Sequence, residues 1–379
     1  MKTKDKKSPA KKAVNILVYI LSAIIGGAVG FLIADRGFSS DEGPLVYLFE
    51  VAVAFLLSVY IGLITHEAGH LLFGFLSGYG FSSFRIGSIM LVKRQGKLSL
   101  CRYSLAGTAG QCLMIPPKSE NGEIPVVLYN LGGVIVNLAV GALSLLLCFF
   151  ADDIFLLTKT LFLTAFVSFF LAISNGLPMN VSGLANDGMN AKSLRKSPLS
   201  AEAFRLQLVI NGEVTDGKRS RDIPDEYFEL LGKTEIDNVH IASLAVFRCG
   251  KIMDEHKFDE ALEAMNTLLN SESEINGVHR MLLVNDCIYI HLLKRNTEEV
   301  RVLLTNEQKK FMKLMEKFPS IIRTEYAIAL VMEENKEKAE KAEQSFRKVK
   351  KHYPHTADIL AEEEFISLVK NEKREGNFV

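Results

Sequence analysis

The segment HEAGH, from His66 to His70, contains residue types that can bind a metal ion and use it. In an α-helix, His66 and His70 are four residues apart, so their imidazoles lie on one face and can converge on one metal ion. Glu67 lies beside them, where its carboxylate can polarise a metal-bound water. Apolar residues flank the motif on both sides. Ionisable groups in such a segment are costly unless they are paired or bind something, so we expect a zinc site rather than two buried core histidines.

Four segments are long and apolar enough to cross a bilayer core about 30 Å thick, which takes about 20 helical residues. They cover approximately residues 14–34, 45–76, 124–150 and 154–177. The first could instead be a signal peptide because a lysine-rich leader precedes it, but its apolar stretch is long and no clear cleavage site follows. We therefore predict an integral membrane protein in which HEAGH lies inside the second span.

Charged residues are distributed unevenly among the links between these spans. Six lysines precede the first span, and the links after the second and fourth spans are basic. The link after the first span and the link between the third and fourth are acidic. Because basic links stay in the cytoplasm, we predict a multi-pass protein of the cell membrane with both termini cytoplasmic. The HEAGH motif then lies in the cytoplasmic half of the bilayer.

A catalytic zinc site needs a third protein ligand besides the two histidines. The remaining six histidines all follow residue 200, but Asp187-Gly188 comes shortly after the fourth span. An Asp-Gly pair is by itself usually a turn. The second and fourth spans run in the same direction, however, so Asp187 can meet the histidines near the cytoplasmic leaflet. We predict one Zn²⁺ per chain, bound by His66, His70 and Asp187, with Glu120 or Glu123 as the next candidates.

The segment between the second and third spans has a different pattern. The stretch from Phe84 to Tyr103 predicts two short strands around a turn at Arg94-Gln95-Gly96. The following residues, 104–117, are rich in glycine and apolar side chains. They are compatible with a cytoplasmic hairpin or with a re-entrant sheet beside the second span, which requires packing on protein or lining a cavity.

In their order along the chain, these features resemble the site-2 protease family of intramembrane zinc metalloproteases. That family has an HExxH motif in its first core helix, a G-x-x-x-N pattern in the second, and an N-x-x-P stretch followed by an Asp-Gly pair in the third. The matching segments are His66–His70, Gly133–Asn137, Asn175–Pro178 and Asp187-Gly188, with the expected strand segment at residues 82–118. The resemblance covers about residues 45–190. The chain departs from the family in a longer stretch before Asp187 and in Val134, where the family often has proline.

The resemblance implies hydrolysis of a peptide bond in or near a transmembrane segment of a membrane-anchored substrate. Regulator release and the processing of peptide precursors or signal remnants are the classes of reaction it suggests. Glu67 would be the catalytic base. Asn137 would contact substrate backbone or the developing oxyanion, although a hydrogen bond between packed helices explains it equally well. Gly132 and Gly133 are better explained by tight helix packing.

From about residue 200 the chain predicts charged amphipathic helices. Residues 256–269 and 338–354 resemble the second helix of a tetratricopeptide repeat. Ala261 and Ala342 are 81 positions apart, which is not a multiple of the usual 34-residue period, so we expect irregular helices between them. A non-repeat helical bundle is the alternative. We expect this part to bind a cytoplasmic protein partner. The zero formal net charge gives no indication of nucleic acid binding, and the five scattered cysteines fit a reducing compartment.

The expected fold is an α-helical integral membrane protein with about four transmembrane helices, a small β-hairpin insertion and a cytoplasmic all-α helical-repeat domain. Residues 1–43 form the leader and first span, residues 44–190 the metalloprotease core, and residues 191–379 the helical domain. A catalytically silent membrane anchor that recruits partners through its helical repeats is the alternative function, which the complete HExxH motif disfavours. A metal transporter and a soluble zinc protease are also disfavoured, because there is one histidine pair and its flanks are apolar on all faces.

Overall fold

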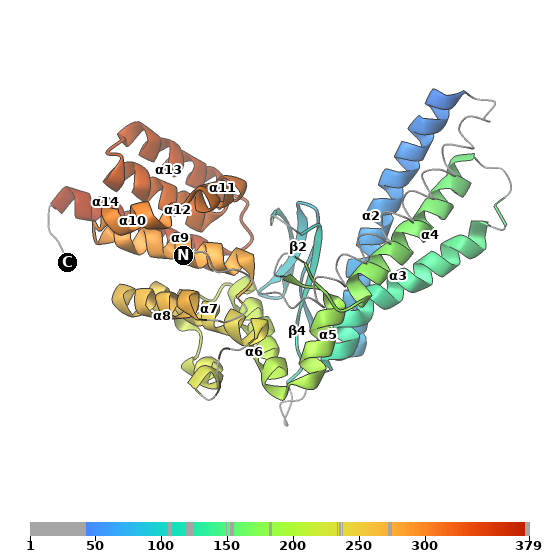
Figure 1. The fold of residues 1–379 in the computed structure, drawn as a ribbon, viewed down its shortest axis with the longest axis horizontal. Helices are drawn as coiled ribbons and strands as arrows, with labels where there is room; N and C mark the ends of the chain where they lie inside the picture. The colour runs from blue at the N-terminus through green and yellow to red at the C-terminus, as the bar shows by residue number, and fades with distance from the viewer. Residues whose placement is uncertain are drawn as a thin grey trace. The chain divides into compact units, whose positions relative to one another are not determined.

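The computed structural model describes residues 43–375 except 105–107, 119–124, 149, 152–154, 182–183, 233, 235, 237 and 272–274. The chain is mostly helical and contains one four-stranded antiparallel sheet. It divides into two compact units. The first contains three long apolar helices and the segment around Asp187, and the second contains the sheet and the helices that follow residue 196 (Figure 1).

Three helices of the first unit are long and apolar enough to cross a membrane. They are α2 (Pro44–Leu76), α3 (Val126–Cys148) and α4 (Phe155–Gly176). The second, third and fourth expected spans are therefore helices of the right length. The first expected span, at residues 14–34, lies outside the described residues. At 1.5 Å per residue, the 33 residues of α2 extend over about 50 Å, which is more than one bilayer core requires.

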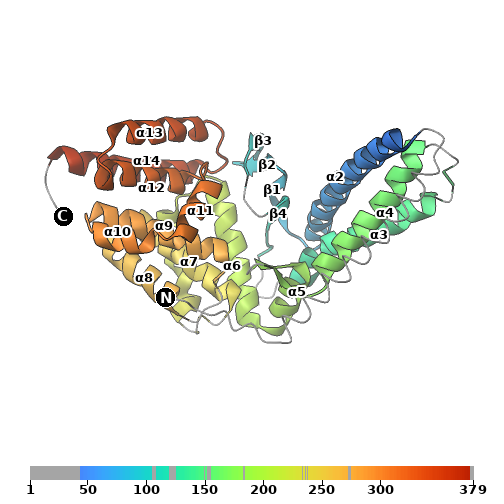
Figure 2. The same cartoon turned by 45° about the horizontal axis from the view of Figure 1, so that its top comes forward.

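The three apolar helices pack side by side in both views of the fold (Figures 1 and 2). A Cβ atom on Gly69 of α2 would overlap the carbonyl of Gly132 in α3, and a Cβ atom on Gly132 would overlap the carbonyl of Gly69. The two backbones therefore touch at this crossing, as the sequence predicted for Gly132. Small residues at a helix crossing let van der Waals contacts form where lipid provides no hydrophobic driving force.

The four-stranded sheet belongs to the second unit and is larger than the predicted hairpin. Its strands are β1 (Gly80–Ile86), β2 (Ile89–Arg94), β3 (Lys97–Arg102) and β4 (Gly110–Ile115), in the order β3-β2-β1-β4. The predicted hairpin is β2 and β3, joined by Gln95 and Gly96 at φ of 46° and 77°. Two positive φ values suit the tight turn that matches the twist of paired strands.

The sequence did not predict β1 and β4 as strands, because apolar and polar residues do not alternate along them as they would in a half-exposed hairpin. The central strand β1 buries the polar residues Ser82, Ser83 and Arg85. Nη1 of Arg85 donates hydrogen bonds to the carbonyls of Gly87 and Thr108, in the loops beside β1 and β4. A sequence pattern of apolar and polar residues therefore underestimates how much of this segment is strand.

Helix α6 (Pro198–Thr215) packs against the sheet within the second unit. Ser197 caps it by accepting a hydrogen bond from the backbone N–H of Ser200 at 3.2 Å. A Cβ atom on Gly212 would lie 2.8 Å from the side chain of Ile115 in β4, so a larger residue would require Ile115 to move. The sheet is thus tied to the helices that follow it in this unit.

The remaining helices of the second unit form antiparallel pairs around one apolar core, which includes Met265, Ile288, Tyr289, Ile322 and Phe346. Two 3₁₀ segments precede them, at Ser220–Asp222 and Asp225–Gly232. The helices are α7 (Val239–Asp254), α8 (Phe258–Asn270), α9 (Gly277–Leu293), α10 (Thr297–Leu303), α11 (Asn306–Leu314), α12 (Pro319–Ala327), α13 (Lys336–Lys350) and α14 (Thr356–Glu375), and a π-helical turn at Ile328–Met332 continues α12.

The turns inside three of these helix pairs share a backbone feature. His256, Arg295 and Glu334 have positive φ values of 61°, 53° and 50°. They follow one another at intervals of 39 residues, and the residue after each is the N-cap of α8, α10 or α13. The helix pairs therefore begin their second helices at a fixed 39-residue spacing.

The same spacing holds in the core of these pairs. Ala261, Val300 and Ala339, again 39 residues apart, are all buried. Ala339 is therefore the counterpart of Ala261, and Ala342, which suggested an interval of 81 residues, lies one turn further along α13. The pairs are more regular than we expected, although the second helix of the middle pair is broken between α10 and α11.

Candidate metal site

The HEAGH motif lies in α2, and the structure buries its three ionisable side chains. His66, Glu67 and His70 are 7, 8 and 9% exposed. Both imidazoles are close to α3. A Cβ atom on Gly133 would lie 2.7 Å from Cε1 of His66, so the absence of a side chain at Gly133 makes room for this ring. Gly133 therefore has a different role from the helix packing that the sequence suggested for it.

Asp187 is the first residue of α5 (Asp187–Lys196), which follows the short strands β5 (Asn180–Val181) and β6 (Leu184–Ala185). The residues before and after it, Asn186 and Gly188, both contact the end of α4. A Cβ atom on Gly188 would overlap the carbonyl of Gly176. The N-terminus of α5 therefore lies directly against the last turn of α4.

Asn186 is a site residue that the sequence reasoning missed. Its amide oxygen accepts hydrogen bonds from the backbone N–H groups of Met179 and Met189, both at 3.0 Å. Its amide nitrogen donates to the carbonyls of Ser174 at 2.7 Å and Leu177 at 2.6 Å. These four bonds fix the entry of α5. The available signal was an asparagine directly before a helix, a common N-cap.

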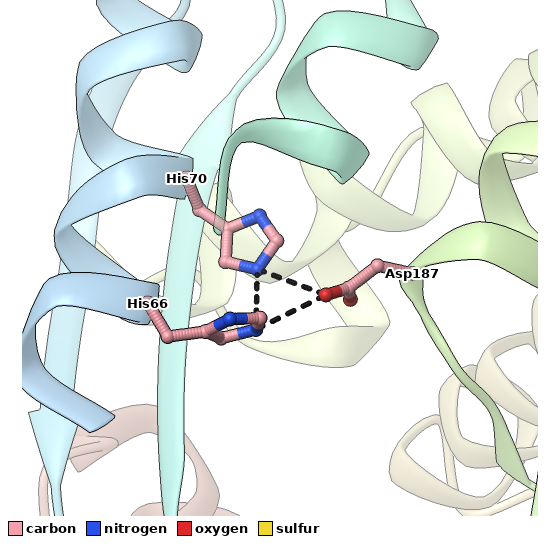
Figure 3. Close-up of side chains that lie close together, drawn as sticks. All are labelled: His66, His70 and Asp187. Atoms are coloured by element: carbon pink, nitrogen blue, oxygen red, sulfur yellow. Dashed lines mark hydrogen bonds and ion pairs between the residues drawn. The ribbon is translucent and has the colours of Figure 1, made fainter. Parts of the chain in front are cut away.

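The three predicted ligands converge in space (Figure 3). Nε2 of His66 lies 3.1 Å and Nε2 of His70 lies 3.4 Å from Oδ2 of Asp187, and the two ring nitrogens are 3.3 Å apart. Ligands about 2.0 to 2.1 Å from a tetrahedral zinc ion are about 3.3 to 3.4 Å from one another. Among the described residues this is the only group of three such side chains that could hold a metal ion.

The chemistry of the three atoms also suits a zinc ion. Oδ2 of Asp187 is buried, and although it is close to both imidazoles it has no partner with hydrogen-bond geometry. Burial alone would raise the pKa of Asp187, but the two imidazoles lower it by more, to about 2. The carboxylate is thus an anion directed at two ring nitrogens. Two imidazoles and one carboxylate are a ligand set of catalytic zinc sites that leaves the fourth position open.

A backbone carbonyl holds the ring of His70. Nδ1 of His70 lies 2.8 Å from the carbonyl oxygen of Tyr129 in α3, so Nδ1–H donates this hydrogen bond. With Nδ1 occupied by this hydrogen bond, Nε2 on the side of Asp187 is the nitrogen that can offer a lone pair to a metal ion. This pairing, in which a metal-binding histidine donates its other ring N–H to a carbonyl, is the usual arrangement around bound metals.

Asn137, the predicted substrate or oxyanion contact, is fully buried and bonded within the helix bundle. Its amide nitrogen lies 3.3 Å from Nδ1 of His66, and its amide oxygen accepts a hydrogen bond from the hydroxyl of Thr65 at 3.0 Å. This placement favours the hydrogen bond between packed helices that the sequence left as an alternative. The alternative ligands Glu120 and Glu123 lie outside the described residues.

No protein-family model matches the sequence, and neither the curated proteins nor the solved structures include a match. The functional assignment therefore depends on the geometry and chemistry of the chain's own residues.

Proposed function

We propose that this chain is an intramembrane zinc metalloprotease of the site-2 protease type. The observation that carries the proposal is the convergence of His66, His70 and Asp187 on one point between apolar helices long enough to span a membrane. Ionisable side chains are rare in such helices and mark functional sites when they occur. A purely structural cluster would not need three metal-ligating groups spaced like the ligands of a zinc ion.

Each residue has a distinct role in the proposed reaction. A zinc ion bound by the three ligands would polarise the scissile carbonyl and acidify a bound water. Glu67 is buried beside His66 on the same helix, and as a base it would take a proton from the water and return it to the leaving amine. The carbonyl of Tyr129 orients His70 throughout.

The surroundings of the site suggest the class of substrate. Leu72 and Phe75, which follow the HEAGH motif on α2, are at least half exposed, as side chains that face lipid would be. A peptide bond that reaches this site must then come from a segment in or near the membrane. Membrane-anchored regulators, peptide precursors and signal remnants are such substrates, and the protein itself would be a multi-pass protein of the cell membrane.

The decisive experiment replaces Glu67. In purified full-length protein, Glu67→Gln should bind zinc as the wild type does but lose cleavage of a membrane-spanning peptide by a factor of at least about 100, because general-base catalysis contributes about 10²- to 10⁴-fold. Glu50→Gln is a matched control, since Glu50 lies on the same helix and pairs with Lys159 at 2.7 Å. Retained turnover in Glu67→Gln would overturn the role of Glu67 as the base, whereas no cleavage by the wild type would favour the silent anchor.

We further propose that the helical part recruits a cytoplasmic protein partner or the substrate. The helix pairs with their 39-residue spacing support this, because stacked helix pairs of the tetratricopeptide kind form extended binding surfaces. A chain that ends after Gly232 keeps α6 against the sheet but lacks α7 to α14. It should retain its zinc and cleave a model peptide, yet process the natural substrate poorly in cells. Normal processing by this well-expressed shorter chain would contradict the recruitment role.

A further inference from the structure

The buried amide of Asn137 determines which nitrogen of His66 carries the proton. As placed in the structure, the amide nitrogen of Asn137 faces Nδ1 of His66, so it donates to a lone pair there. The ring proton is then on Nε2, which points at Oδ2 of Asp187 from 3.1 Å. A protonated Nε2 has no lone pair for a metal ion, so this hydrogen-bond pattern and metal binding by Nε2 exclude each other.

Rotation of the amide by 180° resolves the conflict without moving the backbone. The oxygen and nitrogen of an amide occupy nearly the same volume, so either can face His66. With the oxygen towards the ring, Asn137 accepts a hydrogen bond from Nδ1–H, and the lone pair of Nε2 is directed at the other two ligands. His66 then has the same tautomer that the carbonyl of Tyr129 imposes on His70.

Thr65 makes both amide orientations possible. Its hydroxyl lies 2.9 Å from the carbonyl of Ile61 and 3.0 Å from the amide of Asn137. When the amide oxygen faces Thr65, the hydroxyl donates to that oxygen. When the amide nitrogen faces Thr65, the hydroxyl accepts from it and donates to the Ile61 carbonyl. The amide oxygen and one amide N–H of Asn137 therefore have a partner in either orientation, which avoids the cost of leaving them unsatisfied.

Helix α3 supports the ring of His66 from two residues one turn apart. Gly133 leaves the space that the ring occupies, and Asn137, four residues later on the same face, reaches its Nδ1. The G-x-x-x-N spacing of this helix thus has a physical reason in the shape and hydrogen bonding of one imidazole.

We propose that Asn137 and Thr65 are positioning residues that hold His66 in its Nδ1–H tautomer when a metal ion binds. The inference rests on the metal site of the proposed function but not on protease activity. Loss of such a partner behind a ligating histidine typically lowers metal affinity about 10- to 100-fold.

The test measures binding of Co²⁺, used as a probe for zinc, to purified full-length protein. Asn137→Leu removes both ends of the amide at similar volume and should weaken Co²⁺ binding about 10- to 100-fold. Asn137→Asp keeps an acceptor and should stay within a few-fold of the wild type. Asn130→Leu is the matched control, because Asn130 is a buried asparagine of the same helix whose side chain donates to the carbonyl of Val126. It should bind Co²⁺ like the wild type.

A spectroscopic readout separates positioning from a general structural effect. In the Co²⁺-loaded wild type, proton NMR should show two paramagnetically shifted, exchangeable ring N–H signals, one from each histidine. Asn137→Leu should lose or broaden the His66 signal and keep that of His70, which donates to Tyr129. Thr65→Val should accelerate exchange of the same His66 proton, and it provides the test if Asn137→Leu does not fold.

Two outcomes would overturn the proposal. One is wild-type affinity with both N–H signals unchanged in Asn137→Leu and Thr65→Val. The other is a wild-type protein whose bound Co²⁺ shifts no histidine signal. A wild type that binds Co²⁺ with both signals but cleaves no peptide would refute the protease assignment and leave the positioning role of Asn137 in place.

Discussion

Asp187 is the residue on which the proposed metal site depends most, because two imidazoles alone leave a zinc ion without its usual third protein ligand. Its carboxylate lies against both rings. Without its carboxylate, the two histidines would remain in place on α2 but would lack a third ligand.

We therefore predict that Asp187→Asn lowers zinc content and activity together. Asparagine has nearly the same shape as aspartate but lacks its charge, so we expect at least a tenfold loss of zinc affinity, comparable with that of His70→Ala. Zinc per chain after dialysis against a zinc buffer measures the effect. Full zinc and full activity in Asp187→Asn would place the third ligand elsewhere, with Glu120 or Glu123 next in line.

A second residue-scale prediction concerns Asp358 in α14. Burial, together with the negative charge of Asp254, raises the pKa of Asp358 to about 7. In an unfolded chain its pKa would be about 3.9. The folded state therefore binds this proton more tightly, so the contribution of Asp358 to stability is complete below about pH 4 and is lost as the pH rises through 7.

The variant Asp358→Asn should consequently be as stable as the wild type near pH 3 and increasingly more stable as the pH rises to 8, by up to about 4 kcal/mol. Chemical unfolding of the purified protein at several pH values, followed by circular dichroism, measures this. Asp222→Asn is the control because Asp222 is exposed. An unchanged pH dependence in Asp358→Asn would show that the carboxyl is already ionised in the folded protein at neutral pH.

At the scale of elements, the site depends on how α5 is attached to α4. The attachment consists of the backbone contact at Gly188 and the four hydrogen bonds of Asn186, and it does not involve the ligands themselves. A change in this junction should therefore alter metal binding without removing a ligand.

We predict that Asn186→Ala lowers zinc affinity about tenfold, because the N-terminus of α5 loses its bonds to Ser174 and Leu177 and no longer holds Asp187 against the histidines. Metal titration of the purified variant measures this loss. Asn190→Ala, one turn later in α5, is the matched control and should bind zinc normally. Equal affinities for the two variants would mean that Gly188 alone positions the helix.

The sequence predicts some of these elements well because the signal is contained in the elements themselves. Length and apolar composition define α2, α3 and α4, and the helical spacing of His66 and His70 predicts their convergence. The hydrogen-bond partners of Asn186 and Asn137 could not be predicted in the same way. Their partners are carbonyls and an imidazole from other segments, which no local pattern contains.

The 39-residue spacing was missed for a different reason. The turns that define it use a histidine, an arginine and a glutamate at positive φ. Glycine and asparagine are the residues that normally indicate such a conformation in a sequence. A search for turn residues or for a 34-residue period therefore passes over these positions, and only the backbone dihedral angles reveal the repetition.

At the scale of the whole molecule, the charge of the links predicts which side of the membrane each one occupies. Single cysteines at Ser39 and Asp152, introduced into a cysteine-free chain, should react with an impermeant maleimide in intact cells. A cysteine at Lys97 should react only after the cells are permeabilised. Lys97 is a better probe than Gln95 or Gly96 because those residues need positive φ. Labelling of Lys97→Cys in intact cells would reverse the orientation and place the site on the other side.

The order of the ligands along the chain has a consequence for biosynthesis. His70 and Asp187 are 117 residues apart, and two further apolar helices lie between them. At about 5 to 20 residues per second, a ribosome needs roughly 6 to 25 s to add that segment. During this interval the nascent chain contains Glu67 and the histidine pair but not Asp187. The complete set of three ligands therefore exists only after all three described apolar helices have been synthesised, so under the proposed function a partly made chain would not be an active hydrolase.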